Sequence, residues 1–187
     1  MTVGRFILVA LAAGLLAACD AEPETAAPAA PVEVTADATG RYCGMLLADH
    51  EGPKGQIHLA GSDELIWFSS VRDTIAFTRL PEEPKEIAAI YVNDMGVARS
   101  WSQPEPGTWT EARQAWFVIG SSQRGGMGAP EAVPFSDKSA AEAFRIAHGG
   151  QIVRFDDIPQ DYVLGPVDLD EQPSGQASHS GASHSGH

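Results

Sequence analysis

An internal repeat restricts the fold of this chain more than any other feature of its sequence. Phe68-Ser69 with Ala76-Phe77 matches Phe135-Ser136 with Ala143-Phe144, with the same spacing of nine positions between the phenylalanines. In both copies the apolar residues recur at helical spacing, which predicts two helices with one buried stripe each: Ala76, Phe77 and Leu80 in the first, and Ala143, Phe144 and Ala147 in the second. We expect each helix to begin at a capping serine and to end at Pro81 or at Gly149-Gly150.

Short apolar runs with a preference for strands flank both predicted helices. Two such runs precede each helix and one follows it, so the order ββαβ occurs twice. The expected strands are residues 57–60, 65–68 and 87–92 in the first copy, and 116–120, 132–135 and 152–155 in the second. The sequence therefore predicts an α+β domain of two related ββαβ-type halves with mainly antiparallel sheets.

The two predicted hairpins differ in their loops. Residues 61–64 are enough for the turn of the first hairpin, whereas residues 121–130 form a longer, glycine-rich loop in the second. Loops held by a rigid scaffold often carry function. An insertion at one hairpin tip therefore indicates an added function rather than an addition to the fold.

The expected core lies between two flanking segments. All four Trp fall within residues 41–168, which we expect to be the folded domain because that length suffices to bury a core. Residues 19–40 are rich in Ala, Pro and acidic residues, which predicts a flexible acidic linker. Residues 169–187 form a Gly/Ser/His tail with nothing to bury, and such a composition predicts disorder.

The N-terminus predicts export and lipidation. Residues 1–18 have one base, Arg5, followed by an uncharged apolar run that is too short to span a bilayer but suits a signal peptide. The run ends in Leu16-Ala17-Ala18-Cys19, which resembles a bacterial lipobox, whose cysteine becomes the acylated first residue. We therefore expect Cys19 to anchor the mature protein to a membrane; the alternative is an ordinary signal peptide with an incidental cysteine.

The charge balance argues against one class of partner. The chain has 12 Lys and Arg against 25 Asp and Glu, a formal net charge of −13. Binding of nucleic acid selects for clusters of basic residues on one face. We therefore expect no nucleic-acid partner.

Cys43 is the thiol that remains if Cys19 is acylated. A lone cysteine outside the cytoplasm forms no internal disulfide, so it is either buried and inert or retained for chemistry. In an extended segment Cys43 and Met45 would face the same side, and a thiolate with a thioether is a soft donor pair that selects Cu(I). Packing at the start of a strand is the competing interpretation. No spacing of Cys, His and carboxylates suggests a zinc site.

Two further methionines are candidate thioether ligands. Met127 lies in the polar, glycine-rich run 124–128, where an apolar side chain has no evident packing role. The alternative is that it anchors the loop. Met95 lies in a similar but less suggestive setting, Asn93-Asp94-Met95-Gly96.

The histidines are ambiguous. His50 lies shortly after Met45 and could complete a soft three-coordinate site. His58 falls in an expected strand, where an edge or surface position is the simpler explanation, and His148 falls at a helix C-terminus, where a cation suits the helix dipole. The tail histidines, His179, His184 and His187, form a secondary, weak metal-binding candidate, and a solubilising tail is the alternative.

Signatures of catalysis are missing from the sequence. It contains no G-x-S-x-G motif, no recognisable Cys/His nucleophile signature and no phosphate-binding glycine motif after a strand. A thiol-dependent enzyme that uses Cys43 remains an alternative, although it would also need a positioned base. We expect a binding protein rather than an enzyme.

Taken in order, these motifs resemble the NosL family of periplasmic lipoproteins accessory to nitrous oxide reductase. The resemblance covers nearly all of residues 41–165. It rests on the lipobox, on Cys43-Gly44-Met45 with Gly52-Pro53-Lys54-Gly55-Gln56-Ile57 behind it, on Trp67-Phe68 before a helix, and on Gly126-Met127-Gly128 with Val133-Pro134-Phe135-Ser136.

The resemblance implies a function and a fold. It implies a Cu(I) chaperone for the copper-sulfide centre of the reductase, in the periplasm of a Gram-negative bacterium, with a membrane ABC-type transporter and its periplasmic partner as partners. A general copper-buffering lipoprotein is the alternative. The implied fold is similar to the C-terminal part of organomercurial lyase, but that enzyme's chemistry needs a cysteine pair and the mature domain holds only Cys43.

The resemblance also implies metal ligands. By position, the thiolate ligand is Cys43 and the thioether is Met45 or Met127. The match does not decide whether a histidine such as His50 joins them. The histidine-bearing tail is not part of the family pattern, and its role stays open.

Overall fold

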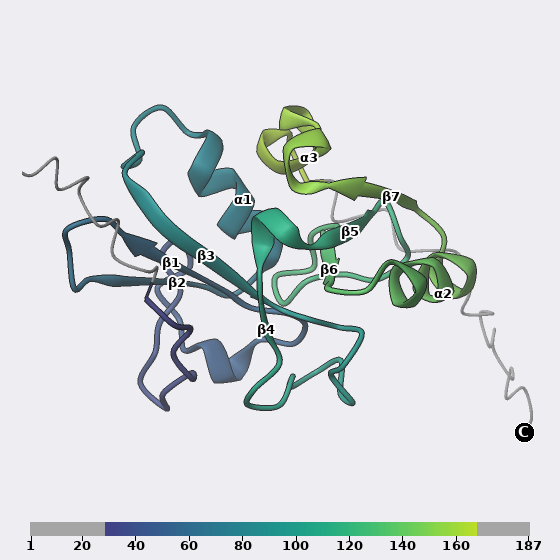
Figure 1. The fold of residues 1–187 in the computed structure, drawn as a ribbon, viewed down its shortest axis with the longest axis horizontal. Helices are drawn as coiled ribbons and strands as arrows, with labels where there is room; N and C mark the ends of the chain where they lie inside the picture. The colour runs from purple at the N-terminus through teal and green to yellow at the C-terminus, as the bar shows by residue number, and fades with distance from the viewer. Residues whose placement is uncertain (1–28, 168–187) are drawn as a thin grey trace, which may run out of the picture.

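The computed structural model describes residues 29–167, which form two antiparallel sheets with three helices (Figure 1). The first sheet has the order β2-β1-β3-β4 and the second the order β6-β5-β7. The strands are β1 (Gly55–Leu59), β2 (Leu65–Phe68), β3 (Ile87–Asn93), β4 (Trp109–Glu111), β5 (Trp116–Ile119), β6 (Val133–Phe135) and β7 (Gln151–Arg154). The helices are α1 (Val71–Arg79), α2 (Lys138–His148) and α3 (Gln160–Leu164), with short 3-10 turns η1 (Leu47–Asp49), η2 (Ala112–Gln114) and η3 (Phe155–Asp157).

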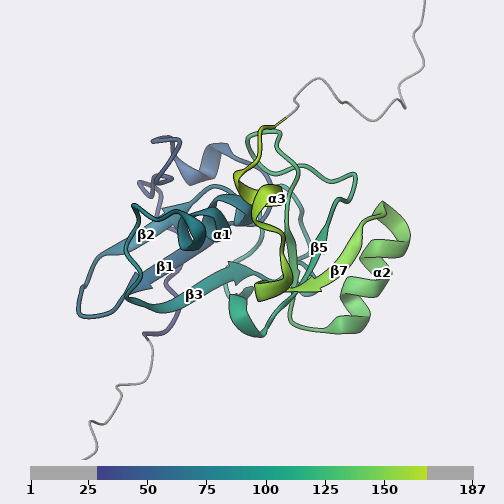
Figure 2. The same cartoon turned by 90° about the horizontal axis from the view of Figure 1, so that it is seen from above.

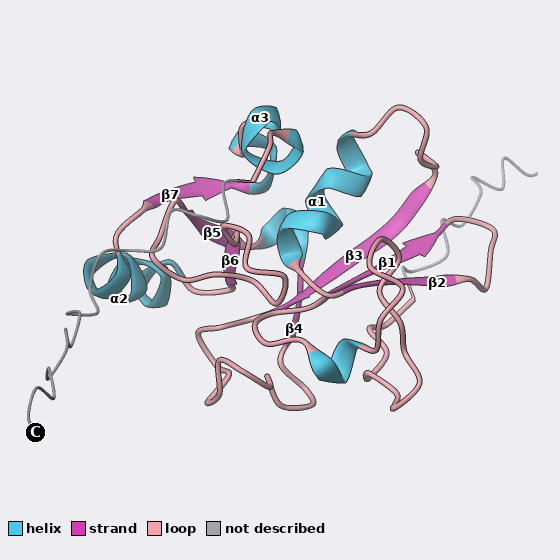
Figure 3. Ribbon diagram, turned by 180° about the vertical axis from the view of Figure 1, so that it is seen from behind, coloured by secondary structure: helices cyan, strands magenta, loops and turns pink. Residues whose placement is uncertain are grey.

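The predicted α+β class with antiparallel sheets is confirmed. Each half runs strand, strand, helix, strand, and in each sheet the first strand of the half lies between the other two. Two elements fall outside the repeat and were not predicted. β4 pairs with β3 at the edge of the first sheet, and α3 packs against α1. Figure 3 shows α1 and α3 on the same side of the molecule.

Local sequence explains where the helices begin and end. Ser70 precedes α1 and accepts a hydrogen bond from Asp73 N, as a capping serine does. The cap of α2 is Asp137, which accepts from Ala140 N, so the serine expected there is wrong. Ser136 instead donates to Asp94 Oδ2. Gly149, with φ of +75°, ends α2 in a conformation that suits glycine.

The buried face of α2 also differs from the prediction. In α1, Ala76 and Phe77 are buried as expected, but in α2, Ala143 and Ala147 are exposed and Phe144 is only partly buried. The reason is that α1 packs against both its own sheet and α3, whereas α2 lies at one end of the molecule (Figure 2) and packs against its own sheet and the loop residue Trp101 but against no second helix among the main contacts of the described residues. A helix covered on one side buries a narrower stripe.

One main core joins the two halves. Buried residues from β1, α1 and β3 pack with Phe117 of β5 and Phe155 of η3 in a single cluster. A smaller cluster forms between the second sheet and α2, around Phe135 and Ala141, and Met95 packs against it. The structure therefore explains Met95 by packing.

The domain begins before residue 41. Val32 exchanges hydrogen bonds of 2.8 and 2.9 Å with the side chain of Gln56, and Glu33 accepts from Gly107 N and from Trp109 Nε1. The predicted linker of residues 19–40 therefore extends too far toward the C-terminus, because residues 29–40 contact the domain. Gln56 on the outer face of β1 needs partners once it is covered, and the incoming backbone supplies them. Cys19, the predicted signal peptide and the predicted tail of residues 169–187 lie outside the described residues.

Candidate metal centre

Cys43 lies in a tight turn that we call the cysteine hairpin, residues 38–47. Thr39 bridges to Leu46, Gly40 N donates to Met45 O at 3.0 Å, and Gly44 N donates to Gly40 O at 2.8 Å. The extended geometry expected for Cys43 and Met45 is therefore wrong. Cys43 Sγ instead contacts the main-chain oxygen of Met45, at 4.0 Å, and the Met45 side chain is exposed.

The half-buried thiol of Cys43 lies among polar atoms from three segments. Its Sγ is 3.9 Å from Gly40 O, 3.6 Å from Ser69 Oγ and 3.8 Å from His50 Nε2. Gly40 lies so close that a Cβ there would be 2.6 Å from the sulfur. The hairpin, the junction between β2 and α1, and the segment after η1 therefore meet at the thiol.

The imidazole ring of His50 lies between this sulfur and the main chain of Gly126. The ring is buried, and its Nδ1 lies 3.2 Å from Gly126 O. Because a carbonyl only accepts hydrogen bonds, Nδ1 carries the proton, and in the neutral imidazole Nε2 then keeps its lone pair. A ligating histidine commonly donates its other N–H to a carbonyl in this way. The structure thus brings together Cys43 and His50, a pairing that the sequence left open.

The glycine-rich loop, residues 121–130, folds back against His50. Gly125 N donates to Ala129 O at 2.9 Å and Gly128 N donates to Gly125 O at 2.8 Å, which makes the tip a closed turn. A Cβ at Gly126 would lie 2.6 Å from His50 Cβ, so only glycine permits this approach. Met127 follows directly, with an exposed side chain.

The other sequence candidates lie apart from this cluster. His58 is on β1, a central strand rather than an edge, where it packs edge-on against Tyr91 and burial lowers its pKa. His148 is at the end of α2, beside Phe144 and Gln123. His179, His184 and His187 lie outside the described residues.

The site offers few side chains that could bind a metal ion. Within residues 29–167, no group of three or more His, Cys, Asp or Glu side chains is placed to hold a metal ion. A metal held by Cys43 and His50 would therefore draw any third protein donor in this region from another residue type, such as a thioether. That combination favours a soft ion over zinc, which usually takes three or four Cys, His or carboxylate ligands.

Two buried ionisable residues, Lys54 and Glu131, lie behind the cluster and were not predicted from the sequence. Lys54 Nζ donates to His50 O at 2.7 Å and to Gly52 O at 2.6 Å, and burial lowers its pKa to about 8. Glu131 Oε1 accepts from Arg72 N at 2.9 Å and from Ala132 N at 2.8 Å, and burial raises its pKa to about 8. Their only sequence signal is a charge beside a buried strand.

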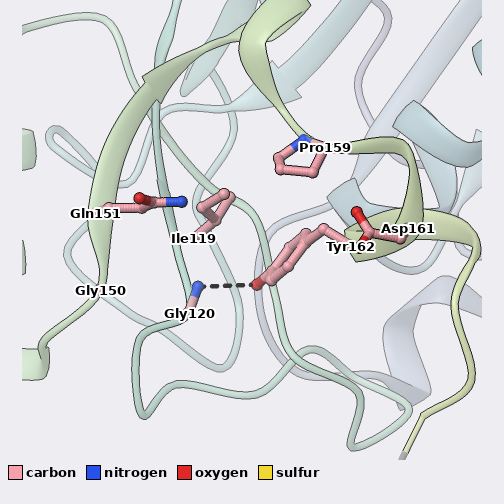
Figure 4. Close-up of a pocket in the computed structure, with 7 residues that line it drawn as sticks. All are labelled: Ile119, Gly120, Gly150, Gln151, Pro159, Asp161 and Tyr162. Atoms are coloured by element: carbon pink, nitrogen blue, oxygen red, sulfur yellow. Dashed lines mark hydrogen bonds between the residues drawn. The ribbon is translucent and has the colours of Figure 1, made fainter.

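Neither of two larger cavities has Cys43 or His50 in its lining. One of about 490 Å³ lies between the end of β5 and α3, where Figure 4 shows the Tyr162 hydroxyl accepting a hydrogen bond of 3.1 Å from Gly120 N. The other, of about 340 Å³, lies beside residues 33–36. At the candidate centre itself, the thiol of Cys43 is partly exposed, whereas His50 is buried.

Comparison with known proteins gives consistent matches. The NosL family model matches residues 31–163. The copper-binding lipoprotein NosL of Achromobacter cycloclastes is 49% identical over 170 residues, which cover 90% of this chain and 87% of that protein. The same-named protein of Stutzerimonas stutzeri is 35% identical over 159 residues, covering 84% and 80%. The crystal structure of the copper chaperone NosL from Shewanella denitrificans has a TM-score of 0.65 and 37% identity, and the match covers 70% of this chain and 96% of that one.

Proposed function

Since this chain belongs to the NosL family, we propose that it is a lipid-anchored Cu(I) carrier that supplies copper for the assembly of nitrous oxide reductase. Membership confirms the resemblance seen in the motifs, and the family is not one of enzymes. Two relatives are named copper-binding lipoproteins and a solved relative is described as a copper chaperone. These names support copper as the cargo of this chain and a lipid as its anchor.

The observation that carries the proposal is the pairing of Cys43 Sγ with His50 Nε2 at 3.8 Å. Bonds from a d¹⁰ metal ion such as zinc to sulfur and nitrogen are about 2.3 and 2.0 Å, so one ion of this size can bond both atoms at an angle of about 120°. Such an angle leaves room for a third donor in a trigonal arrangement. A thiolate with an imidazole and a thioether is a donor set suited to Cu(I).

Met127 is our proposed third ligand, with Met45 as the alternative. Met127 follows Gly126, whose carbonyl holds the His50 ring, so it lies one residue from a group already fixed at the site. Both side chains are exposed, at 46% for Met127 and 43% for Met45. An exposed thioether is easily displaced, which suits a carrier that must release its metal. The tail histidines would bind copper weakly at most, because each recruited ligand costs ordering entropy.

The remaining parts of the proposal concern location and partners. The lipobox at Cys19 supports an anchor in the periplasm of a Gram-negative bacterium. The described residues contain no helix long and apolar enough to cross a bilayer. The family's link to nitrous oxide reductase supports delivery to its copper-sulfide centre, through a membrane ABC-type transporter and the transporter's periplasmic partner.

Competition for Cu(I) with a chelator of known affinity tests the carrier function. We expect the purified protein to bind one Cu(I), Cys43→Ser to lose tight binding, and His50→Gln to bind more weakly. His58→Gln is the matched control, because it removes an imidazole outside the site. Affinity should also fall as the pH drops, since protons compete for the thiolate. Equal affinities for Cys43→Ser and the wild type would refute the ligand assignment.

A further inference from the structure

We infer that Glu131 is a positioning residue for the copper site: its buried carboxyl group fixes the glycine-rich loop so that Gly126 O holds His50 with Nε2 facing Cys43. The inference rests on the proposed Cu(I) carrier function. The Glu131 side chain accepts hydrogen bonds from Arg72 N and Ala132 N rather than from a proposed metal ligand, so it acts through the loop.

Glu131 ties the end of this loop to the start of α1. Its Oε1 accepts from Arg72 N, an amide in the first turn of the helix that has no partner within the helix. The two residues are 59 positions apart in the chain. The same helix start carries Ser69, whose Oγ contacts Cys43 Sγ. One carboxyl group thereby connects the loop of Met127 to the segment that contacts the thiol.

The loop backbone lies directly on this carboxyl group. A Cβ at Gly125 would be 2.5 Å from Glu131 Oε2 and 3.5 Å from Ser70 Cβ. Gly125 is the residue before Gly126, and its N–H closes the loop turn onto Ala129 O. The position of Glu131 therefore sets how close Gly126 O comes to His50.

The burial of Glu131 costs free energy of folding, which indicates that the carboxyl group has a role. Its side chain is 1% exposed, and Oε2 accepts no hydrogen bond from the described residues. Burying a carboxyl group with an unpaired oxygen is unfavourable, and an apolar residue of similar size would avoid that cost. The burial that raises its pKa also favours the neutral form, which still accepts hydrogen bonds at Oε1. The feature that an apolar residue cannot supply is this acceptor.

Glu131 would affect Cu(I) binding through the position of the imidazole proton of His50. While Gly126 O lies 3.2 Å from His50 Nδ1, the neutral imidazole carries its proton on Nδ1 and the lone pair of Nε2 faces the sulfur. If the loop shifts, the ring loses that acceptor and both tautomers become populated. Cu(I) must then select the competent tautomer, which lowers its apparent affinity.

The test uses a matched pair of variants. Glu131→Gln keeps the acceptor and the shape, whereas Glu131→Leu keeps the size and removes the acceptor. The imidazole tautomer is read from ¹⁵N NMR of histidine-labelled, copper-free protein, and Cu(I) affinity from chelator competition. We expect Glu131→Gln to match the wild type. Glu131→Leu should show both His50 tautomers and about tenfold weaker Cu(I) binding, the usual scale for groups that orient metal ligands.

Two further variants keep the test decisive. Gly125→Ala places a methyl group against Glu131 Oε2 and should displace the loop without changing the carboxyl group, which covers the case that Glu131→Leu fails to fold. Glu142→Leu is the control, because it makes the same substitution at a carboxyl group on α2 that pairs with Arg145 of the same helix. It should leave the His50 tautomer unchanged.

A double-mutant comparison separates positioning from general destabilisation. If Glu131 acts through His50, Glu131→Leu should weaken Cu(I) binding in the wild type but not in a His50→Gln background. Equal loss in both backgrounds would overturn the inference, as would an unshifted tautomer in both Glu131→Leu and Gly125→Ala. The NMR measurement needs no copper. A wild type that carries the proton on His50 Nδ1 yet binds no Cu(I) would therefore refute the proposed function. The effect of Glu131 on the His50 tautomer would still stand.

Discussion

At the scale of single residues, Met127 is a proposed copper ligand whose replacement should leave the fold unchanged. Its side chain is exposed, so Met127→Leu should change the free energy of unfolding by no more than about 0.5 kcal/mol. The variant loses a neutral thioether but keeps the thiolate, so it should weaken Cu(I) binding less than Cys43→Ser does. In a denitrifying cell it should lower the copper content of the reductase more than the reductase's abundance.

Met95→Leu is the control for that experiment, because Met95 packs against the second core cluster. It should bind Cu(I) as the wild type does. If Met127→Leu also binds like the wild type while Met45→Leu does not, the third ligand comes from the cysteine hairpin instead.

Glu131 should give stability a pH dependence of known sign. Burial raises its pKa from 4.5 to about 8, so the folded state binds more protons than the unfolded state between these values. The contribution of Glu131 to stability is therefore fully present below about pH 4.5 and is lost as the pH rises through about 8. Denaturant unfolding from pH 5 to 8 should show the wild type losing stability relative to Glu131→Gln. A constant difference between the two proteins would contradict the raised pKa.

The sequence marks Cys43, His50 and the methionines as candidate ligands but does not show which of them lie together, for a physical reason. Cys43 and Met127 stood out because a lone exported thiol and a thioether among glycines lack ordinary explanations. The position of the His50 ring depends on a contact with Gly126 O, which is 76 positions away, and no local pattern encodes such a contact. The error at Cys43 and Met45 arose because Gly44 adopts φ of +65°, which turns the chain instead of extending it.

At the scale of elements, the cap of α2 can be tested directly. Asp137 accepts from Ala140 N at 3.0 Å, although the repeat pointed to the serine before it. Asp137→Ala should cost about 1 kcal/mol of stability, and Asp137→Asn should restore most of it because asparagine caps comparably well. Thermal or denaturant unfolding measures both. Equal stability of Asp137→Ala and the wild type would show that another group caps the helix.

The repeat predicted the order of the helices and strands well, but it did not predict which other elements pack against them. The residues of β1, β2 and β3, and of β5, β6 and β7, lie close to the predicted runs because alternating or continuous apolar segments identify strands locally. The prediction of the buried face of α2 was wrong because α3, which packs on α1, is not part of the repeat and has no counterpart on α2. Burial of a helix face is set by what packs on it, which lies elsewhere in the chain.

At the scale of the whole molecule, few residues separate Cys19, the proposed anchor, from the described domain. Residues 20–28 separate Cys19 from the first described residue, and a stretch of that length spans about 35 Å at most when fully extended. Residues 29–37 then lie on the domain, held through Gln56, Tyr91 and Trp109. An acylated Cys19 would therefore keep the copper site near the membrane surface, within reach of a membrane-bound acceptor.

Replacing each cysteine in turn tests that arrangement. Cys19→Ala removes the acyl chains and should release the protein from the membrane fraction, because hydrocarbon chains on that residue supply the membrane affinity. Cys43→Ser is the matched control: it also removes one thiol, but should stay in the membrane fraction while losing Cu(I) binding. Cys19→Ala, in turn, should bind Cu(I) normally once purified and yet lower the copper content of the reductase in cells. Retention of Cys19→Ala in membranes washed with high salt would show that another part of the protein holds it there.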